Sequence, residues 1–154
     1  MSEALRYEGL IAACGMNCGL CIGFLREKKP CGGCFRRDHK NKPELCRSCS
    51  IKNCELLAQT ESGFCYECSK FPCARLKGLD QRYRSKYGMR MIENLLYIQE
   101  NGMLSFLESE QERWTCRECN FGVSVHRDYC LNCKSQFDVL VRPKQYGAFR
   151  NRKD

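Results

Sequence analysis

Four cysteine-rich segments decide the fold of this chain: CGMNCGLC (residues 14–21), CGGC (31–34), CRSCSIKNC (46–54) and CYECSKFPC (65–73). They hold eleven of the fifteen cysteines in the 154-residue sequence. A CxxC turn directs two thiolates at one cation, so two such turns complete a tetrahedral site. The segments therefore predict a cysteine-rich module that is organised by bound metal.

The high cysteine content also raises the alternative of a disulfide framework, which is typical of secreted proteins. The first residues, MSEALR, do not lead into the basic start and apolar stretch of an export signal. No apolar run approaches the roughly 18 residues of a membrane helix. We therefore expect a cytoplasmic protein with reduced thiols and no membrane segment. The odd number of cysteines also fits metal ligation better than pairwise bridging.

The net charge of +8 at first favours a nucleic-acid partner. That value treats every cysteine as neutral. Fifteen thiolates would add fifteen negative charges and four Zn²⁺ ions would add eight positive ones, which brings the total to about +1. Many lysines and arginines are therefore expected to compensate the negative charge of thiolate centres.

A separate cysteine motif lies near the C-terminus, with CREC at residues 116–119 and CLNC at residues 130–133. Two CxxC pairs at this short interval predict a zinc ribbon, in which two turns on β-hairpins share one ion. Asn120 follows the first pair and tolerates the left-handed backbone conformation better than most residues. Because four cysteines complete the site, we expect a structural ion and do not assign His126 to it.

The segment between the two cysteine-rich regions carries the strongest helical pattern. Apolar residues recur at helical spacing in residues 89–100, and a second helix is expected from residue 103 to about 113. These two helices are expected to supply most of the conventional core. Pro72 suits the first position of an earlier helix. Alternating apolar residues at 123–125 and 137–141 predict strands.

We therefore predict a small α+β protein that is metal-stabilised and largely irregular. Its parts are a cysteine-rich multi-metal module (residues 1–75), a helical segment (76–113), a zinc ribbon (114–142) and a basic tail (143–154). Residues 14–73 contain few large apolar side chains, so burial would not offset their ordering entropy. Structural zinc contributes on the order of 10 kcal/mol per site and can replace that core.

All fifteen cysteines are candidate metal ligands, for about three or four Zn²⁺ ions per chain. They are Cys14, Cys18, Cys21, Cys31, Cys34, Cys46, Cys49, Cys54, Cys65, Cys68, Cys73, Cys116, Cys119, Cys130 and Cys133. The eleven upstream cysteines do not divide evenly into four-ligand sites. Three sites would need a twelfth ligand, for which His39 is a candidate.

The sequence leaves the grouping of the upstream ligands open. One partition joins Cys18, Cys21, Cys31 and Cys34 in one site and Cys46, Cys49, Cys65 and Cys68 in another. Partitions that also use Cys14, Cys54 and Cys73 agree with the spacing equally well.

One spacing favours iron–sulfur chemistry instead of zinc. Cys14-x3-Cys18-x2-Cys21 matches the spacing with which radical S-adenosylmethionine enzymes hold three irons of a four-iron cluster. Those enzymes enclose their substrate in a much larger barrel than 154 residues can form. The alternative function is therefore an iron–sulfur redox or sensor protein, in which a fourth cysteine such as Cys73 would complete the cluster.

Together these motifs resemble a known family, the domain of unknown function 3795. The likeness is carried by the motifs at residues 14–21 and 31–34, the two C-x2-C-x4-C segments and the ending Phe71-Pro72-Cys73. Residues 79–95 resemble members that carry a C-terminal ribbon. The resemblance implies a metal-binding character and no particular activity. The first ribbon turn departs from the CPxCG pattern of similar members at Arg117 and Asn120, which leaves the ligands intact.

The sequence contains no motif of a common catalytic site, such as GxxxxGK[ST], GxSxG, HExxH or GxGxxG. We therefore expect a zinc-dependent binding or adaptor protein with an unidentified protein partner rather than an enzyme. A nucleic-acid-binding protein is a further alternative, because basic and aromatic residues alternate in residues 77–90. A solvated helix face whose tyrosines pack inward explains the same pattern, and we favour that interpretation.

Overall fold

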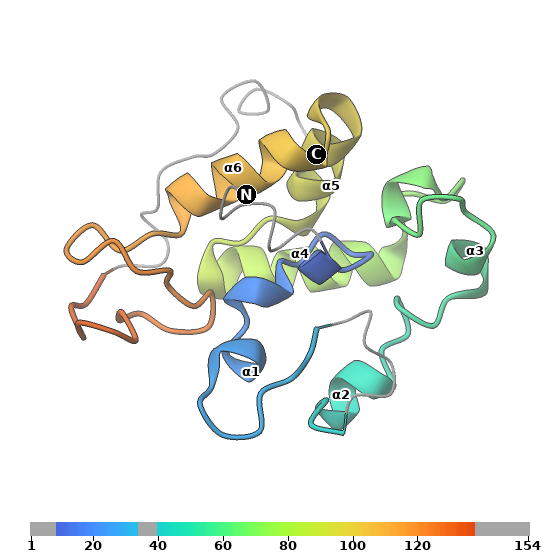
Figure 1. Cartoon of the computed structure of the whole chain (residues 1–154). Helices are drawn as coiled ribbons and strands as arrows, with labels where there is room; N and C mark the ends of the chain where they lie inside the picture. Colours follow the sequence, from blue (N-terminus) through green and yellow to red (C-terminus); the bar gives the residue numbers. More distant parts are fainter. Residues whose placement is uncertain (1–8, 34–39, 138–154) are drawn as a thin grey trace.

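The computed structural model describes residues 9–33 and 40–137 (Figure 1). Three helices form most of the regular structure: α4 (Ala74–Tyr87), α5 (Met91–Asn101) and α6 (Met103–Arg113). The cysteine-rich half contains only short elements: η2 (Cys18–Leu20), α1 (Ile22–Leu25), α2 (Glu44–Arg47), α3 (Glu55–Ala58) and η3 (Cys65–Glu67). None of the helices in these ranges is both long and apolar enough to cross a membrane.

Helix α5 is the centre of this arrangement. It packs against both α4 and α6, and η3 also contacts it. Met91 and Leu95 on α5 are fully buried, and Ile98 is nearly so. These residues follow the helical spacing that predicts a helix at residues 89–100. The structure confirms that helix and the one that follows it.

Glycines and one aspartate set the helix ends. Gly88 ends α4 with a φ of 70°, and Gly102 separates α5 from α6 with a φ of 88°. Positive φ angles strain any residue that has a Cβ, so glycine suits both turns. Asp80 on α4 is buried, and its carboxylate accepts a 3.1 Å hydrogen bond from the backbone N–H of Ile92. Through Asp80, α4 satisfies a donor in the first turn of α5.

Helix α4 begins later than the sequence predicts. Pro72 is not its first residue: the helix starts at Ala74, after Cys73 in an extended conformation. Pro72 instead follows a turn in which the N–H of Phe71 donates to the carbonyl oxygen of Cys68 over 3.1 Å. The proline therefore belongs to the loop that carries the cysteines rather than to the helix.

A buried amide fixes the first cysteine loop against α5. Asn94 is fully buried, and its Nδ2 donates a 2.9 Å hydrogen bond to the carbonyl oxygen of Gly15. Gly15 has a φ of 92°, and a Cβ there would lie 2.6 Å from the carbonyl oxygen of Met91. Glycine is therefore needed for this close approach. The N–H of Cys65 also donates to the carbonyl of Ala13 over 3.0 Å, which joins η3 to the same loop.

The hydrophobic core extends across the cysteine-rich and helical segments. Its larger cluster includes Ala12, Met16, Ile51, Leu76, Met89, Met91, Leu95, Trp114, Val123 and Val125. A smaller cluster consists of Ile11, Ile98, Phe106 and Leu107. Helix α5 contributes to both clusters and α6 to the smaller one, and Ile11 and Ala12, which lie just before Cys14, contribute as well. The cysteine-rich half is thus partly held by conventional packing.

The described residues contain isolated bridges in place of strands. These antiparallel bridges pair Ile11 with Asn17, Thr115 with Gly122, and Tyr129 with Gln136. The predicted strand at 123–125 is absent, because the backbone N–H groups of its valines donate to different segments, at Trp114 and Leu20, rather than to one partner strand. The expected α+β class is therefore corrected to a mostly helical fold. Most of the predicted strand at 137–141, and the basic tail, lie outside the described residues.

Replacing Gly15 by alanine is expected to destabilise the fold more than the same change at Gly63. Both glycines have positive φ, 92° and 75°, so each substitution costs about 1 kcal/mol or more in backbone strain. At Gly15 the new methyl group also meets the Met91 carbonyl oxygen, whereas nothing lies within 4 Å at Gly63. Denaturant unfolding of both metal-loaded variants should show an additional loss of about 2 kcal/mol for Gly15→Ala. Equal losses would contradict the docking of the loop on α5.

Candidate metal centre

The first pair of the C-terminal cysteines lies on a tight turn directly after α6. The N–H of Cys116 donates to the carbonyl oxygen of Phe121 over 2.7 Å, and the N–H of Asn120 donates back to the carbonyl of Cys116 over 2.9 Å. The turn closes because Asn120 adopts a φ of 63°. The sequence predicts that Asn120 tolerates this conformation, and the structure confirms it.

The second pair repeats this geometry with different residues. The N–H of Cys130 donates to the carbonyl oxygen of Ser135 over 2.9 Å, and the N–H of Lys134 donates to the carbonyl of Cys130 over 2.9 Å. Lys134 has a φ of 67° and occupies the position that Asn120 has in the first turn. The sequence offers no signal for this conformation, because lysine is not a residue that favours positive φ.

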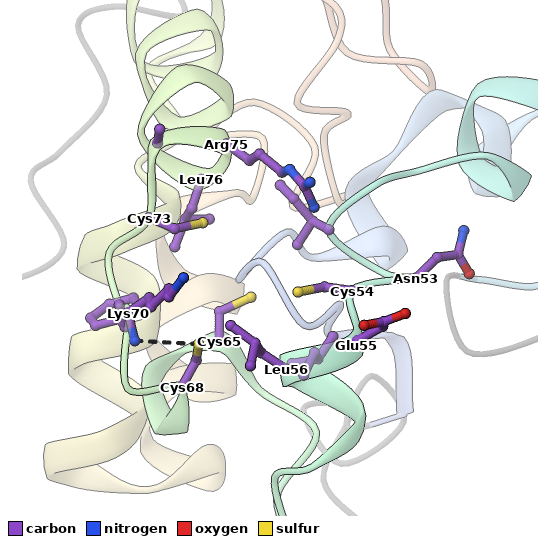
Figure 2. Close-up of a pocket in the computed structure, with 14 residues that line it drawn as sticks. Asn53, Cys54, Glu55, Leu56, Cys65, Cys68, Lys70, Cys73, Arg75 and Leu76 are labelled. Atoms are coloured by element: carbon purple, nitrogen blue, oxygen red, sulfur yellow. Dashed lines mark hydrogen bonds between the residues drawn. The ribbon is translucent and has the colours of Figure 1, made fainter.

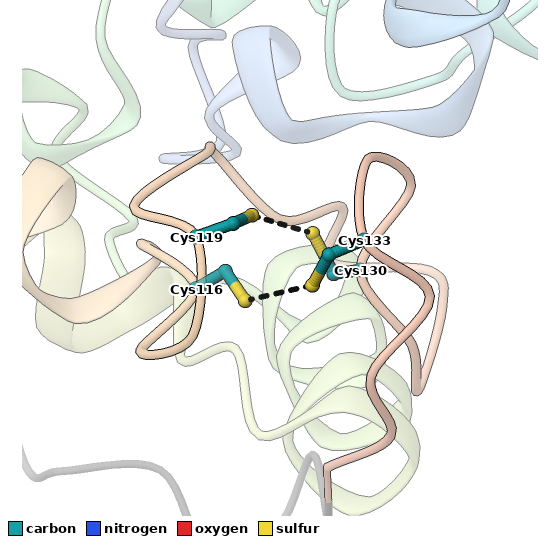
Figure 3. A group of neighbouring side chains, drawn as sticks. All are labelled: Cys116, Cys119, Cys130 and Cys133. Carbon is teal, nitrogen blue, oxygen red and sulfur yellow. Dashed lines mark hydrogen bonds between the residues drawn. The ribbon is translucent and has the colours of Figure 1, made fainter.

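The two turns bring four sulfur atoms together (Figure 3). The Sγ atoms of Cys116, Cys119, Cys130 and Cys133 all lie within 4.8 Å of one another. Cys116 and Cys133 are 3.7 Å apart between sulfurs, and Cys119 and Cys130 are 3.6 Å apart. A tetrahedral ion with bonds of about 2.3 Å would separate its ligands by about 3.8 Å. The group therefore has the spacing of a metal site.

Hydrogen-bond donors near Cys116 and Cys119 favour the thiolate forms of these two residues. The Ser135 hydroxyl is the main cause that lowers the pKa of Cys116 to about 6, followed by the backbone N–H groups of Cys119 and Glu118. The Asn132 amide is the main cause that lowers the pKa of Cys119, and its Nδ2 lies 3.5 Å from that sulfur. Thiolates are the form that binds metal. Sequence reasoning missed Asn132 and Ser135, although both lie within two residues of a CxxC cysteine.

His126 packs away from this group, against α1 and α4. Its Nδ1 accepts a 3.3 Å hydrogen bond from the N–H of Ile22, and its Nε2 lies 3.0 Å from the Tyr83 hydroxyl. The ring also contacts Tyr87 edge to face, at 5.0 Å between centroids. These contacts agree with the prediction that His126 is not a ligand of the four-cysteine site. They also turn both tyrosines of α4 toward the protein, as the favoured interpretation of residues 77–90 expects.

The remaining described cysteines line two neighbouring cavities. One is lined by Cys54, Cys65, Cys68 and Cys73. The other is lined by Cys14, Cys18, Cys21, Cys31, Cys46 and Cys49. Cys46 and Cys49 therefore line a different cavity from Cys65 and Cys68, which disfavours a single site made of these four residues. The division favours instead the partitions in which Cys54 and Cys73 are ligands. Cys34 and His39 lie outside the described residues.

The sulfur spacing distinguishes the C-terminal group from these cavities. Within residues 9–33 and 40–137, it is the only group of three or more potential ligands whose atoms lie within 4.8 Å of one another. Every cysteine in these ranges is unbridged. The described cysteines are thus available as ligands, but only the C-terminal four are already at the distances of a single-ion site.

Comparison of the chain with protein-family models, curated proteins and solved structures found no match. The resemblance to the domain of unknown function 3795 stays a prediction.

We expect His126 to make stability depend on pH below neutrality. Burial is the main cause that lowers its pKa from 6.5, with the Arg127 charge second. The unfolded chain therefore binds a proton before the folded one does, and the free energy of unfolding falls as the pH drops from 7 through 6.5. In His126→Asn, the side-chain oxygen can still accept from Ile22 but cannot titrate.

Denaturant midpoints at several pH values between 7.5 and 5.5 measure this effect. Thiolate protonation contributes to both proteins, so the difference between their slopes isolates His126. Wild type should lose more stability than His126→Asn across this range. Identical slopes would contradict a buried, neutral His126.

Proposed function

We propose that this chain is a zinc-binding protein in which Cys116, Cys119, Cys130 and Cys133 hold one structural Zn²⁺ in a ribbon-like arrangement. The observation that carries the proposal is the convergence of four sulfur atoms within 4.8 Å. The ion stabilises the surface through which the protein binds a protein partner. Binding, rather than catalysis, follows from a closed site that leaves no coordination position for a substrate.

The donor set supports zinc over other common cations. Calcium and magnesium require oxygen ligands, whereas this site offers four sulfurs. Tetrahedral four-cysteine sites bind zinc or iron, and two CxxC turns are typical of structural zinc. The Ser135 hydroxyl lies 3.0 Å from the sulfur of Cys133 and 3.6 Å from that of Cys116, where it orients the ligands.

The ion also has a clear structural task. Each turn is closed by one isolated bridge, and the described residues between them form no ladder of strand hydrogen bonds. Four bonds from one ion would join the two turns directly. Phe121 forms the edge of the first turn with 53% of its surface exposed, which makes it the first residue to test for partner binding.

A second candidate function is that of an iron–sulfur redox or sensor protein. The observation that favours it is the cavity lined by six cysteines, which include the spaced set Cys14, Cys18 and Cys21. Its volume is about 580 Å³, and among the described residues no three of its sulfurs lie within 4.8 Å of one another. Such spacing suits a cluster better than a single ion. A colourless protein after anaerobic purification would exclude this function.

The variant Cys119→Ser tests the zinc site, with Ser135→Ala as the matched control. Cys119→Ser removes a ligand, so we expect loss of about one zinc per chain by elemental analysis and destabilisation of several kcal/mol. Ser135→Ala removes only a hydrogen bond to the ligands, so it should retain that zinc with an affinity about 10-fold lower in a chelator competition.

Cobalt substitution provides a second readout of the same site. Co²⁺ bound by four thiolates in a tetrahedron absorbs strongly in the visible range, and these bands should appear in the Co²⁺-loaded protein and weaken in Cys119→Ser. Unchanged zinc content and unchanged cobalt spectra in Cys119→Ser would refute the proposal.

A further inference from the structure

A cavity between the start of α4, η3 and the start of α3 contains four cysteines that the C-terminal site does not use (Figure 2). Its volume is about 580 Å³. We propose that Cys54, Cys65, Cys68 and Cys73 form a second metal centre, which takes a thiophilic metal as a single Zn²⁺ or as an iron–sulfur cluster. This centre is independent of the zinc site proposed above, because the two share no ligand.

Cys65 and Cys68 occupy a compact turn whose backbone is fixed by hydrogen bonds. The N–H of Cys68 donates to the carbonyl oxygen of Cys65 over 3.1 Å. The N–H of Lys70 points at the Cys68 sulfur from 3.5 Å, as the dashed line in Figure 2 shows. A backbone donor directed at a sulfur stabilises its thiolate form. The pair thus supplies two ligands on one rigid turn.

Cys54 and Cys73 reach the cavity from two other segments. Cys54 directly precedes α3, and Cys73 directly precedes α4. Both have extended backbones that end where a helix begins. Figure 2 shows the side chains of Cys54 and Cys65 directed toward each other across the cavity, with Cys73 beside the start of α4. Three separate segments therefore contribute thiols to one space.

Four thiolates in one cavity would repel one another. Cys54, Cys65, Cys68 and Cys73 line the same cavity, and like charges that are held close together destabilise each other. A cation placed among them would convert that repulsion into attraction.

Positive side chains border the same cavity. Arg75 and Lys70 both line it. Arg75 donates a 3.3 Å hydrogen bond from Nη1 to the carbonyl oxygen of Ser50, which connects α4 to the segment that carries Cys54. A centre with four thiolates and one Zn²⁺ carries two negative charges, and such basic neighbours offset them.

The same four cysteines could bind either a single Zn²⁺ or an iron–sulfur cluster, and the spacing of their sulfurs bears on both. The close grouping seen at the C-terminal site is not repeated here among the described residues, so these sulfurs are more widely separated. A single Zn²⁺ would draw them inward to about 3.8 Å from one another. A cluster would bind them nearer to their present positions and fill more of the cavity.

Serine variants of the anaerobically purified full-length chain test the centre. Cys65→Ser and Cys73→Ser should each lose one zinc, or one cluster's complement of iron together with visible colour. Both should retain the zinc that depends on Cys119. Ser69→Ala changes an exposed residue in the same loop and should keep the wild-type metal content. Loss of zinc without colour identifies the single ion, and loss of iron with colour identifies the cluster.

Thiol alkylation of the wild-type protein tests the same centre without any substituted protein, so the result does not depend on whether a variant folds. In the metal-loaded protein, Cys54, Cys65, Cys68 and Cys73 should react at least about 10-fold more slowly than in the denatured chain, and chelation should release all four together. The proposal is overturned if these thiols react at the denatured rate with metal present, or if Cys65→Ser and Cys73→Ser keep the full zinc and iron content. Loss of metal from Cys119→Ser alone would support only the C-terminal site.

Discussion

The hydrogen bond from the buried Asn94 amide to the carbonyl oxygen of Gly15 positions the first cysteine loop on the helical core. An unsatisfied buried amide costs about 1–3 kcal/mol, so the loop and α5 are held in one register. The neighbouring segments attach to this loop in turn: the N–H of Cys65 bonds to Ala13, and the N–H of Val125 bonds to Leu20. A single polar contact in an apolar interior thus aligns segments that lie far apart in sequence.

Hydrophobic packing stabilises the helical part of the molecule, and metal ligation suits the cysteine-rich part. Aliphatic and aromatic side chains of α4, α5 and α6 form a core that also includes Trp114 and the residues before Cys14. The short turns that bear the cysteines add a few residues to that core, such as Met16 and Ile51, but they lack the apolar area to order themselves without further stabilisation. Sulfur ligation suits such segments, because one ion bonds several turns without requiring strands or a second core.

Part of this arrangement follows from local sequence patterns. Apolar spacing predicts α5 and α6, and two CxxC pairs ten residues apart predict the C-terminal group, because each turn forms from neighbouring residues. The grouping of the upstream cysteines depends instead on long-range packing. Cys54 and Cys73 enter one cavity because two different helices begin there, which spacing alone does not reveal. The contact of His126 with Tyr83 is equally non-local, since it joins residues 43 positions apart.

Helix α4 spaces two parts of the protein. It has 14 residues and is about 21 Å long, with Cys73 immediately before one end and Tyr83 and Tyr87 in its last two turns. Those tyrosines touch His126, which lies between the two C-terminal cysteine pairs in sequence. The loop that carries Cys73 and the loop that carries His126 therefore meet opposite ends of the same helix, and the length of α4 sets how far apart they lie.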